Sequence, residues 1–264
     1  MITLKDPLGN EITLRHPAKR IVSLVPSQTE LLFDLGLDEE VVGITKFCIH
    51  PESWFRSKFR VGGTKDFKID KIKSLQPDLI LANKEENIKD TLNILQQEFP
   101  VYVSDIHNLE DSFQMIQDVG LICGKKSESH AITNEIREGF SSMPLSTRKL
   151  KVLYLIWRNP WMAAGNDTFI SDMLDHCGFE NACKDERYPQ LDENKLSILN
   201  PDLIFLSSEP YPFKEIHIKE LQAIAPHSKI MLVDGEMFSW YGSRLRYSPL
   251  YFQEKIIQAT NLYF

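Results

Sequence analysis

Aromatic and arginine side chains gather in the segments that follow the predicted strands in the second half of the chain. These segments read WRNPWMAAGND, SSEPYPF and DGEMFSWYGSRLRYSP, and they hold three of the four tryptophans. In open α/β sheets, ligands bind beyond the carboxyl ends of the strands. Rings and guanidinium groups in such places favour a wide cleft that holds a large, partly planar ligand with polar edges. For any one tryptophan, a position in a hydrophobic core is the alternative.

Motifs of catalysis are absent from the sequence. The chain contains no GxSxG, GxxxxGK[ST], GxGxxG or HExxH pattern, so we do not expect an enzyme. Its seven histidines form no short-spaced pair, and we expect neither a metal site nor a cofactor of its own. His50 is the one histidine that we single out, as an axial ligand or polar contact to a cobalt or iron complex.

Composition indicates a folded, water-soluble protein, with 42% hydrophobic and 25% charged residues. A net charge of −7 disfavours nucleic acid as a partner. No apolar run reaches the ~20 residues that cross a bilayer, and the first residues lack the apolar middle of a secretory signal. The four cysteines form no CxxC pair and are expected to be buried thiols; a bridge between Cys177 and Cys183 is the alternative in an oxidising compartment.

One stretch of sequence occurs twice. KSLQPDLILANKEE, residues 73–86, matches SILNPDLIFLSSEP, residues 197–210, and aligns Pro77 with Pro201 and Asp78 with Asp202, 124 residues apart. In both copies a proline separates a helix-like segment from an apolar strand. Because 264 residues can fill two small lobes, the repeat predicts two related α/β lobes.

Strands alternate with helices in both halves, which is typical of parallel sheets covered on both faces. The predicted strands are 21–24, 41–45, 78–82 and 101–104 in the first half, and 151–157, 201–207 and 229–234 in the second. A hairpin precedes them over residues 2–14, and a purely helical segment, which Gly124 divides, follows from about residue 109 to 140. We therefore expect an N-terminal lobe over 1–108, a helical connector over 109–148 and a C-terminal lobe over 149–264.

Several of these segments resemble a known family. RIVSLVPSQTELLFDLGL, RVGGTKDFKIDKIKSLQPDLILA and GFENACKDERYPQLDENKLSILNPDLIFLSS are similar to the cobalamin-binding members of the periplasmic binding proteins of ABC importers. Their branch is built on a backbone helix and includes siderophore and haem receptors. The resemblance runs from about Arg20 to Ile257. It implies two Rossmann-like lobes, a long rigid helix that joins them, a corrinoid or other metal chelate in the cleft, and a monomer.

The resemblance also suggests ligand contacts. Phe47 matches an aromatic residue that lines the corrin site, whereas Thr64 and Tyr188 stand where the vitamin B12 binder has tryptophans. The expected ligand contacts, taken from the resemblance and from the loops, are Pro26, Ser27, Phe47, His50, Thr64, Lys65, Trp157, Arg158, Trp161, Met162, Tyr188, Ser239, Trp240, Tyr241 and Arg244.

In the same family one carboxylate per lobe docks onto arginines of the membrane permease. The matching positions are Asp70 and Asn194, again 124 residues apart, and Glu193 would supply the charge that Asn194 lacks. The resemblance implies a periplasmic location; because no signal peptide is recognisable, the cytoplasm is the alternative.

The sequence thus predicts a binding protein that captures a cobalamin-like corrinoid and delivers it to an ABC importer. A ferric siderophore or haem is the alternative ligand, and Arg158, Arg244 and Arg246 would then pair with its anionic groups. The alternative from another class is a cytoplasmic cofactor-handling protein or enzyme, with Glu30, Glu209 and His50 as acid–base groups.

Overall fold

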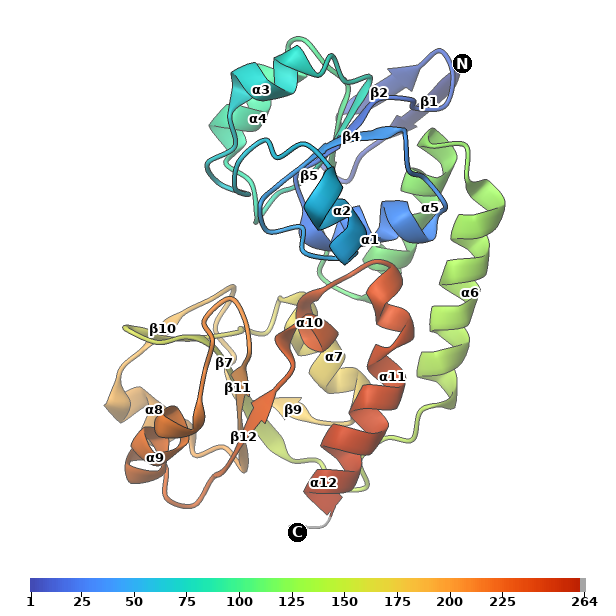
Figure 1. Ribbon diagram of the computed structural model, residues 1–264. Helices are drawn as coiled ribbons and strands as arrows, with labels where there is room; N and C mark the ends of the chain where they lie inside the picture. Colours follow the sequence, from blue (N-terminus) through green and yellow to red (C-terminus); the bar gives the residue numbers. More distant parts are fainter. Residues whose placement is uncertain (262–264) are drawn as a thin grey trace. The chain divides into compact units, whose positions relative to one another are not determined.

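The computed structural model describes residues 1–261, which divide into two compact units (Figure 1). Unit 1 comprises Met1–Ile106, Glu110–Arg137 and Tyr241–Arg246, and unit 2 comprises His107–Leu109, Glu138–Trp240 and the chain from Tyr247 on. Residues 262–264, which the predicted C-terminal lobe includes, lie outside the described residues. The segment predicted as a connector is shared between the two units. Each unit contains a sheet of its own, so the α/β class is confirmed.

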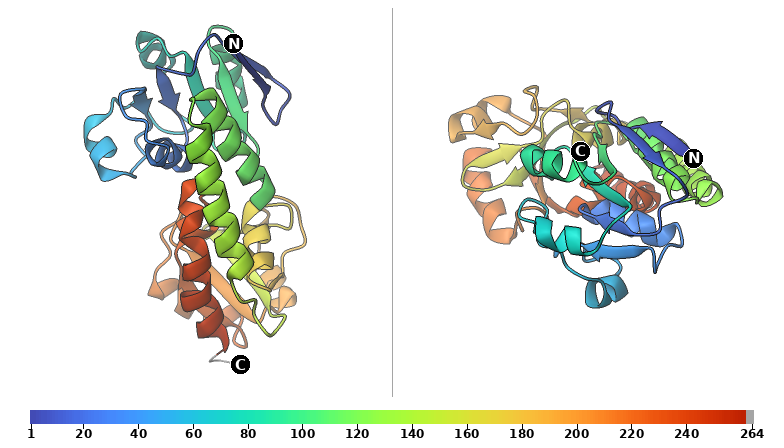
Figure 2. Two further views of the ribbon diagram at one scale, coloured as in Figure 1. Left: turned by 90° about the vertical axis from the view of Figure 1, so that its right-hand side faces the viewer. Right: turned by 90° about the horizontal axis from the view of Figure 1, so that it is seen from above.

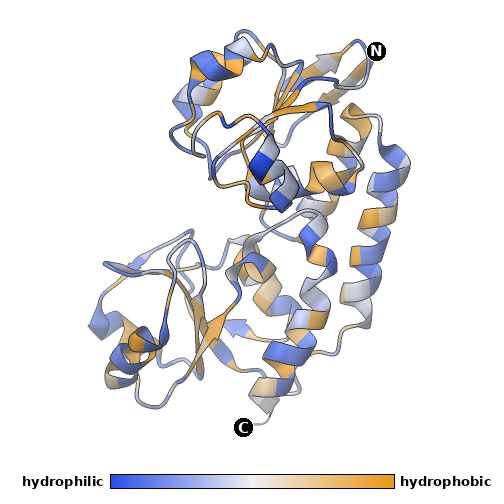
Figure 3. Ribbon diagram, viewed as in Figure 1, coloured by the Kyte–Doolittle hydropathy of each residue, from blue (hydrophilic) through white to orange (hydrophobic). Residues whose placement is uncertain are grey.

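The sheet of unit 1 has four strands in the order β4-β3-β5-β6. They are β3 (Ile21–Ser23), β4 (Val41–Ile44), β5 (Leu79–Asn83) and β6 (Val101–Ser104). All three pairings are parallel, as the sequence predicts. Almost every strand residue is buried, and Figure 3 shows these strands as largely hydrophobic. Burial of both faces explains why the strands read as continuous apolar runs and not as alternating ones.

Four helices connect these strands: α1 (Pro26–Asp34), α2 (Glu52–Ser57), α3 (Ile69–Ser74) and α4 (Lys89–Gln96). The helical segment that follows is divided at Gly124, as predicted, into α5 (Leu109–Ile122) and α6 (Lys126–Ser142). Gly124 takes a φ of +70°, which favours glycine because it has no Cβ. The two helices lie side by side in both views of Figure 2. A Cβ on Gly120 of α5 would meet the Ser129 hydroxyl at 2.1 Å, so only glycine permits this approach.

The N-terminal hairpin pairs β1 (Ile2–Lys5) with β2 (Glu11–Leu14) in antiparallel register. In its turn the Asp6 carboxylate accepts hydrogen bonds from the backbone N–H groups of Leu8 and Asn10. It also accepts one from the N–H of Val103 at 3.1 Å. Because β6 is an edge strand, Val103 would otherwise lack a strand partner on that side, and the hairpin therefore protects the edge.

The sheet of unit 2 is mixed. Its order is β10-β8-β7-β11-β12, with β9 pairing only with β7, and its strands are β7 (Lys151–Trp157), β8 (Trp161–Ala163), β9 (Glu180–Asn181), β10 (Gln190–Leu191), β11 (Leu203–Ser207) and β12 (Lys229–Val233). The pairings of β7 with β11 and of β11 with β12 are parallel, as predicted. The sheet also contains β8 and β10, which the sequence did not predict as strands and which pair antiparallel. Residues 158–160 are too few for the crossover that a parallel strand needs.

The helices of unit 2 are α7 (Phe169–His176), α8 (Glu193–Leu199), α9 (Glu215–Ile224) and α10 (Gly235–Ser239). The 3-10 helix η1 (Ser243–Arg246) belongs to unit 1, and α11 (Ser248–Tyr251), the π-helical η2 (Phe252–Ile257) and α12 (Gln258–Asn261) follow it. All four cysteines are buried free thiols, which is the first of the two interpretations of the sequence.

The repeated Pro-Asp segment forms the same corner in each unit. The residue before the proline has a left-handed conformation in both, with φ of 45° at Gln76 and 41° at Asn200. The Asp78 carboxylate accepts hydrogen bonds from the backbone N–H groups of Lys19 (2.9 Å) and Arg20 (2.8 Å), just before β3. Asp202 accepts one from Lys151 at the start of β7 (2.7 Å). The repeat therefore encodes the joint between a strand and its parallel neighbour.

Substitution of Asp78 tests this joint. Asp78→Ala leaves two backbone N–H groups without their acceptor, and we expect the free energy of unfolding to fall by about 1–3 kcal/mol. Asp78→Asn keeps one acceptor oxygen, so its loss should be smaller, and Asp202→Ala, which removes a single bond, should also cost less. Urea unfolding followed by circular dichroism gives the ranking. Equal stability of Asp78→Ala and the wild type would contradict the stabilising role of the Asp78 hydrogen bonds.

Candidate functional site

The expected ligand contacts are distributed over both units. Unit 1 carries Pro26, Ser27, Phe47, His50, Thr64, Lys65, Tyr241 and Arg244, and unit 2 carries Trp157, Arg158, Trp161, Met162, Tyr188, Ser239 and Trp240. Several of them lie at or after the carboxyl end of a parallel strand, where such sheets bind ligands: Pro26 and Ser27 after β3, Phe47 and His50 after β4, and Trp157 with Arg158 at the end of β7.

In unit 1 a layer of buried polar side chains lies at the ends of β5 and β6. The Gln28 amide donates to the Ser104 hydroxyl at 2.7 Å, and the Asn83 amide donates to the same oxygen at 3.1 Å. The side-chain oxygen of Asn83, Oδ1, accepts hydrogen bonds from the backbone N–H groups of Glu85 and Glu86. These bonds hold the loop after β5 in one conformation.

Tyr241 reaches this layer from the distant segment of the chain that joins unit 1. Its hydroxyl donates to Glu86 Oε1 at 3.1 Å, and burial together with the Glu86 charge raises the pKa of Tyr241 well above its ordinary value. Ser27 lies beside this hydroxyl. Ser27 Oγ and Gln28 Oε1 are buried atoms without a hydrogen-bond partner among the described residues. Unpartnered buried oxygens of this kind suit a polar group of a ligand or an ordered water.

Glu30 and Arg244 form a bidentate ion pair in unit 1. Arg244 Nε donates to Glu30 Oε2 at 2.7 Å and Arg244 Nη2 donates to Oε1 at 2.8 Å. Burial raises the pKa of Glu30, although Arg244 and, more weakly, His50 act to lower it. The charge of His50 thus acts on Glu30, which the sequence suggested as an acid–base group and which the structure pairs with the expected ligand contact Arg244. Because Arg244 already holds a carboxylate, it is a support of the site and not a free cation.

Phe47 is the exposed ring among the expected contacts of unit 1. Its exposed fraction is 50%, and the Lys46 ammonium lies 5.0 Å from the ring centroid. Nearby, the backbone carbonyl of Thr64 accepts a hydrogen bond from the Asn87 amide at 2.8 Å, which fixes the loop that carries Thr64 and the exposed Lys65. A ligand can therefore stack on Phe47 without prior unfolding.

In unit 2 an aromatic pair follows the ends of β7 and β11. Trp157, with an exposed fraction of 39%, meets Tyr211 in a T-shaped contact with 5.6 Å between ring centroids. Tyr211 was not among the expected contacts, although it lies in the segment SSEPYPF. Its position after the predicted strand 201–207 is the sequence feature that could have identified it as a ligand contact. The pair offers apolar ring surface with a hydroxyl at one edge.

Trp161 occupies the core of unit 2. It is 4% exposed and stacks parallel to Phe213, with 6.1 Å between centroids. The Arg158 guanidinium lies over the Trp161 ring at 4.3 Å and forms two hydrogen bonds with the Glu220 carboxylate. For Trp161 the core interpretation therefore holds. Met162 in β8 and Tyr188 in the loop before β10 are half-buried.

Glu209 organises the loop that carries Ser239 and Trp240. Its Oε1 accepts from the Ser239 hydroxyl at 2.7 Å and from Trp240 Nε1 at 2.8 Å. Burial is the main cause that raises the pKa of Glu209, and the charges of Glu236 and Asp234 raise it further. Trp240 itself is only 7% exposed, so Glu209 positions a ring that offers little open surface. Glu85, which the repeat aligns with Glu209, is exposed.

The three expected docking residues lie at exposed helix starts. Asp70 is in the first turn of α3, and Glu193 and Asn194 are in the first turn of α8. The repeat thus gives Asp70 and Asn194 equivalent positions in the two units, each seven residues before the proline of a Pro-Asp corner.

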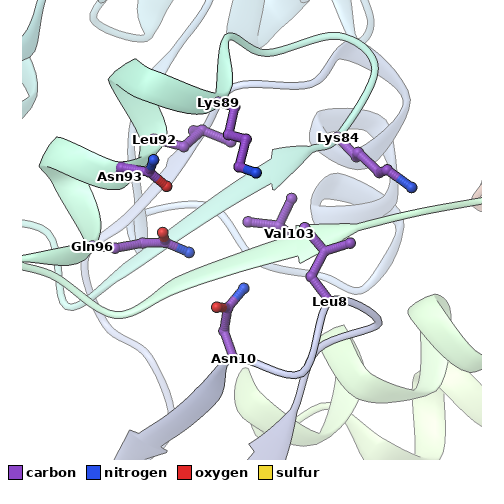
Figure 4. A pocket seen from close by; sticks show the side chains of 8 residues that line it. All are labelled: Leu8, Asn10, Lys84, Lys89, Leu92, Asn93, Gln96 and Val103. Carbon is purple, nitrogen blue, oxygen red and sulfur yellow. The ribbon is translucent and has the colours of Figure 1, made fainter.

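A separate pocket of about 410 Å³ opens in unit 1 between α4 and the hairpin turn (Figure 4). Figure 4 shows Lys89, Leu92, Asn93 and Gln96 of α4 on one side and Leu8 and Asn10 on the other, with Val103 and Lys84 completing the lining. None of the expected ligand contacts lines it. Its lining holds no carboxylate and no nucleophile.

Among residues 1–261, no group of three or more His, Cys, Asp or Glu side chains is arranged to hold a metal ion. Over the same residues, no helix combines the length and the apolar character needed to cross a membrane.

The family of the chain follows from its match to known proteins. Residues 21–224 match the family model described as periplasmic binding protein, which is more than half of the chain. The chain therefore belongs to the periplasmic binding protein family. Members of this family bind and hand over transported ligands, and they are not enzymes.

Two relatives are similar over most of their length. An uncharacterized ABC transporter substrate-binding lipoprotein, YvrC of Bacillus subtilis, is 24% identical over 92% of this chain and 82% of its own. A vitamin B12-binding protein of Vibrio parahaemolyticus is 24% identical over 73% of this chain and 72% of its own.

Solved structures share the fold. The periplasmic vitamin B12-binding protein BtuF of Vibrio cholerae has a TM-score of 0.74 at 21% identity and covers 93% of this chain and 99% of its own. The periplasmic heme-binding protein RhuT of Roseiflexus has a TM-score of 0.78 at 20% identity, over 92% and 99%. The catecholate-siderophore binding protein VctP of Vibrio cholerae has a TM-score of 0.78 at 14% identity, over 98% and 99%.

The buried Glu209 carboxyl predicts a pH dependence of stability. Its pKa in the folded state lies above the ordinary value of 4.5, so the folded state binds the proton more tightly than the unfolded chain. This contribution is full below about pH 4.5 and is lost as the pH rises through the folded-state pKa. Relative to Glu209→Gln, which stays neutral, the wild type should lose stability as the pH rises above about 4.5.

Thermal unfolding of the wild type and of Glu209→Gln at pH values below and above 4.5 measures the difference in their stability. Glu85→Gln, at the equivalent exposed position of the repeat, is the matched control for the change in net charge. A stability difference between the wild type and Glu209→Gln that grows in favour of the wild type with rising pH would contradict the raised pKa of Glu209.

Proposed function

We propose that this substrate-binding protein of the ABC importer type captures a corrinoid and delivers it to the permease of its importer. The observation that carries the proposal is that each unit, taken by itself, has aromatic rings with exposed surface at or after the carboxyl ends of its strands: Phe47 in unit 1, and Trp157 with Tyr211 in unit 2. A macrocycle offers a flat apolar face to such rings.

Polar groups of unit 1 favour a ligand with neutral hydrogen-bonding edges. Corrinoids carry amide side chains, which suit the unpartnered oxygens of Ser27 and Gln28 because an amide N–H can donate to each. The relatives described as vitamin B12-binding proteins support the same ligand class.

A ferric siderophore or haem is the second candidate, because proteins of similar fold bind haem or a catecholate siderophore. Both ligands carry anionic groups that favour arginine partners. Arg158 and Arg244 are already bonded to Glu220 and Glu30. An anionic ligand would have to compete with these carboxylates, whereas a corrinoid would not.

A role as an enzyme has little support in the site. Glu30 is held by Arg244, and Glu209 is occupied by Ser239 and Trp240. Neither carboxylate is positioned with a nucleophile in the way that acid–base chemistry requires.

Isothermal titration with cyanocobalamin, cobinamide, haemin and a ferric hydroxamate tests the ligand. We expect one-to-one binding of the two corrinoids. Phe47→Ala and Trp157→Ala should each weaken it by about ten-fold, the loss of one aromatic stacking contact. Phe59→Ala is the matched control, because Phe59 is exposed to a similar extent (47%) but follows α2 and not a strand. Binding of haemin alone would replace the corrinoid by the second candidate, and failure of all four would overturn the proposal.

We also propose that Asp70 in unit 1, and Glu193 with Asn194 in unit 2, contact the permease, and that the protein works as a periplasmic or lipid-anchored monomer. All three residues are exposed, which such contacts require.

Asp70→Ala should leave corrinoid affinity unchanged and weaken association with the permease by about five-fold, because a charge at the rim of an interface contributes little more than 1 kcal/mol. Asn194→Asp should strengthen association by restoring the second carboxylate. Both effects can be measured by binding to the importer in nanodiscs. Unchanged association in both variants would remove α3 and α8 from the contact.

A further inference from the structure

Positive charge is concentrated in one segment of unit 1. Residues 46–73 hold eight Lys and Arg (46, 56, 58, 60, 65, 68, 71 and 73) against three Asp and Glu (52, 66 and 70), a net charge of +5 in a chain of net charge −7. The remainder of the chain therefore carries −12. Two of the eight cations are paired with carboxylates outside the segment, Lys58 with Asp38 and Lys73 with Glu98. The excess of positive charge remains after these pairs are set aside.

The same segment places cations directly on aromatic rings. The Arg60 guanidinium lies 4.4 Å from the centroid of Phe55, and the Lys71 ammonium lies 5.6 Å from that of Phe59. The Lys71 ammonium also donates to the Arg60 carbonyl at 3.5 Å, which joins α3 to the strand-like residues after α2. The two cation–ring pairs, Arg60 with Phe55 and Lys71 with Phe59, are therefore linked to one another.

Much of this surface is open to solvent. Phe59 is 47% exposed, Arg60 and Lys68 are exposed, and Phe33 of α1 adds a ring that is 43% exposed and packs against Trp54 of α2. We call the side chains of Phe33, Phe55, Phe59, Arg60, Lys68 and Lys71 the basic-aromatic surface; α2 and α3, which carry or flank most of them, are labelled in Figure 1. Exposed apolar side chains that gather in one region mark interaction sites more often than singly scattered ones do.

We propose that the basic-aromatic surface binds the headgroup region of a membrane that contains anionic phospholipid. Rings with a polar neighbour settle at the level of the headgroups, and lysines and arginines next to them are attracted to lipid phosphates. The acidic remainder of the chain is repelled by the same surface, so the charge distribution orients unit 1 with α2 and α3 toward the lipid.

The charge and the rings together select this partner. A nucleic acid would call for a more basic protein than one of net charge −7. An acidic protein would use the cations but would leave Phe33 and Phe59 without an apolar counterpart. The proposal does not depend on the ligand of the protein, because none of the six residues belongs to the expected ligand contacts.

Co-sedimentation with vesicles tests the proposal on the full chain. Vesicles of phosphatidylcholine with about 30% phosphatidylglycerol should bind the protein, binding should fall as salt screens the charges, and pure phosphatidylcholine should bind it much less. The variant Lys68→Gln with Lys71→Gln should lower the partition coefficient about 25-fold, since each lysine near an anionic surface contributes about five-fold.

Matched controls separate this surface from net charge and from folding. Lys219→Gln with Lys255→Gln removes two exposed lysines of unit 2 and should bind like the wild type. Phe59→Ser should weaken binding while corrinoid titration, which reports on the ligand site, stays unchanged. Equal binding to both kinds of vesicle, or equal losses in the two double-lysine variants, would overturn the proposal. Loss of corrinoid binding with intact vesicle binding would instead contradict the function proposed above.

Discussion

The carboxylate that follows the repeated proline is the constraint on which both sheets depend. The backbone N–H groups of Lys19, Arg20 and Lys151, at the starts of two strands, each donate a hydrogen bond to a carboxylate, and hydrogen bonds to a charged acceptor are stronger than those between neutral groups. The Asp78 carboxylate accepts these hydrogen bonds just before β3, and the Asp202 carboxylate accepts one at the start of β7. The proline ends the preceding helix, and the left-handed residue before it turns the chain into the corner. Once neighbouring strands are aligned at this end, their opposite ends emerge together, and the loops with the candidate site follow from that alignment.

The two units use the same corner but finish their sheets differently. In unit 1 the loop after β5 is held by the Asn83 side chain, and the neighbouring Glu85 is exposed. In unit 2 the equivalent Ser207 bonds the carbonyl of Glu209, and the Glu209 carboxyl turns inward to hold Trp240. Close packing makes this possible, because a Cβ on Gly235 would meet Glu209 Cγ at 2.7 Å. A duplicated scaffold thus supports two unlike surfaces, a polar layer with one open ring and an aromatic pair.

Positive charge is unevenly distributed along the chain, although the net charge of the whole chain is −7. Arginines that the sequence offers to an anionic ligand are bound to carboxylates within their own unit, Arg158 to Glu220 and Arg244 to Glu30. Cations without such partners gather instead on α3 and beside α2, over exposed rings. These two arginines are therefore occupied within the chain, while the basic-aromatic surface and the exposed Asp70 next to Lys71 in the sequence are suited to partners at the membrane.

The sequence by itself determined the elements and their class. Apolar runs placed β3 to β7, β11 and β12 but not the short strands β8, β9 and β10. Gly124 divided the helical segment, and the repeat with its offset of 124 residues predicted two related units. Only the tertiary structure decided which side chains are open. It placed Trp161 in a core, joined Tyr211 to Trp157, buried Glu209 but not Glu85, and brought Tyr241–Arg246 back to unit 1. Burial and ion pairing depend on residues far apart in sequence, so no local pattern can show whether a tryptophan meets a ligand or a core, or whether an arginine is already bound.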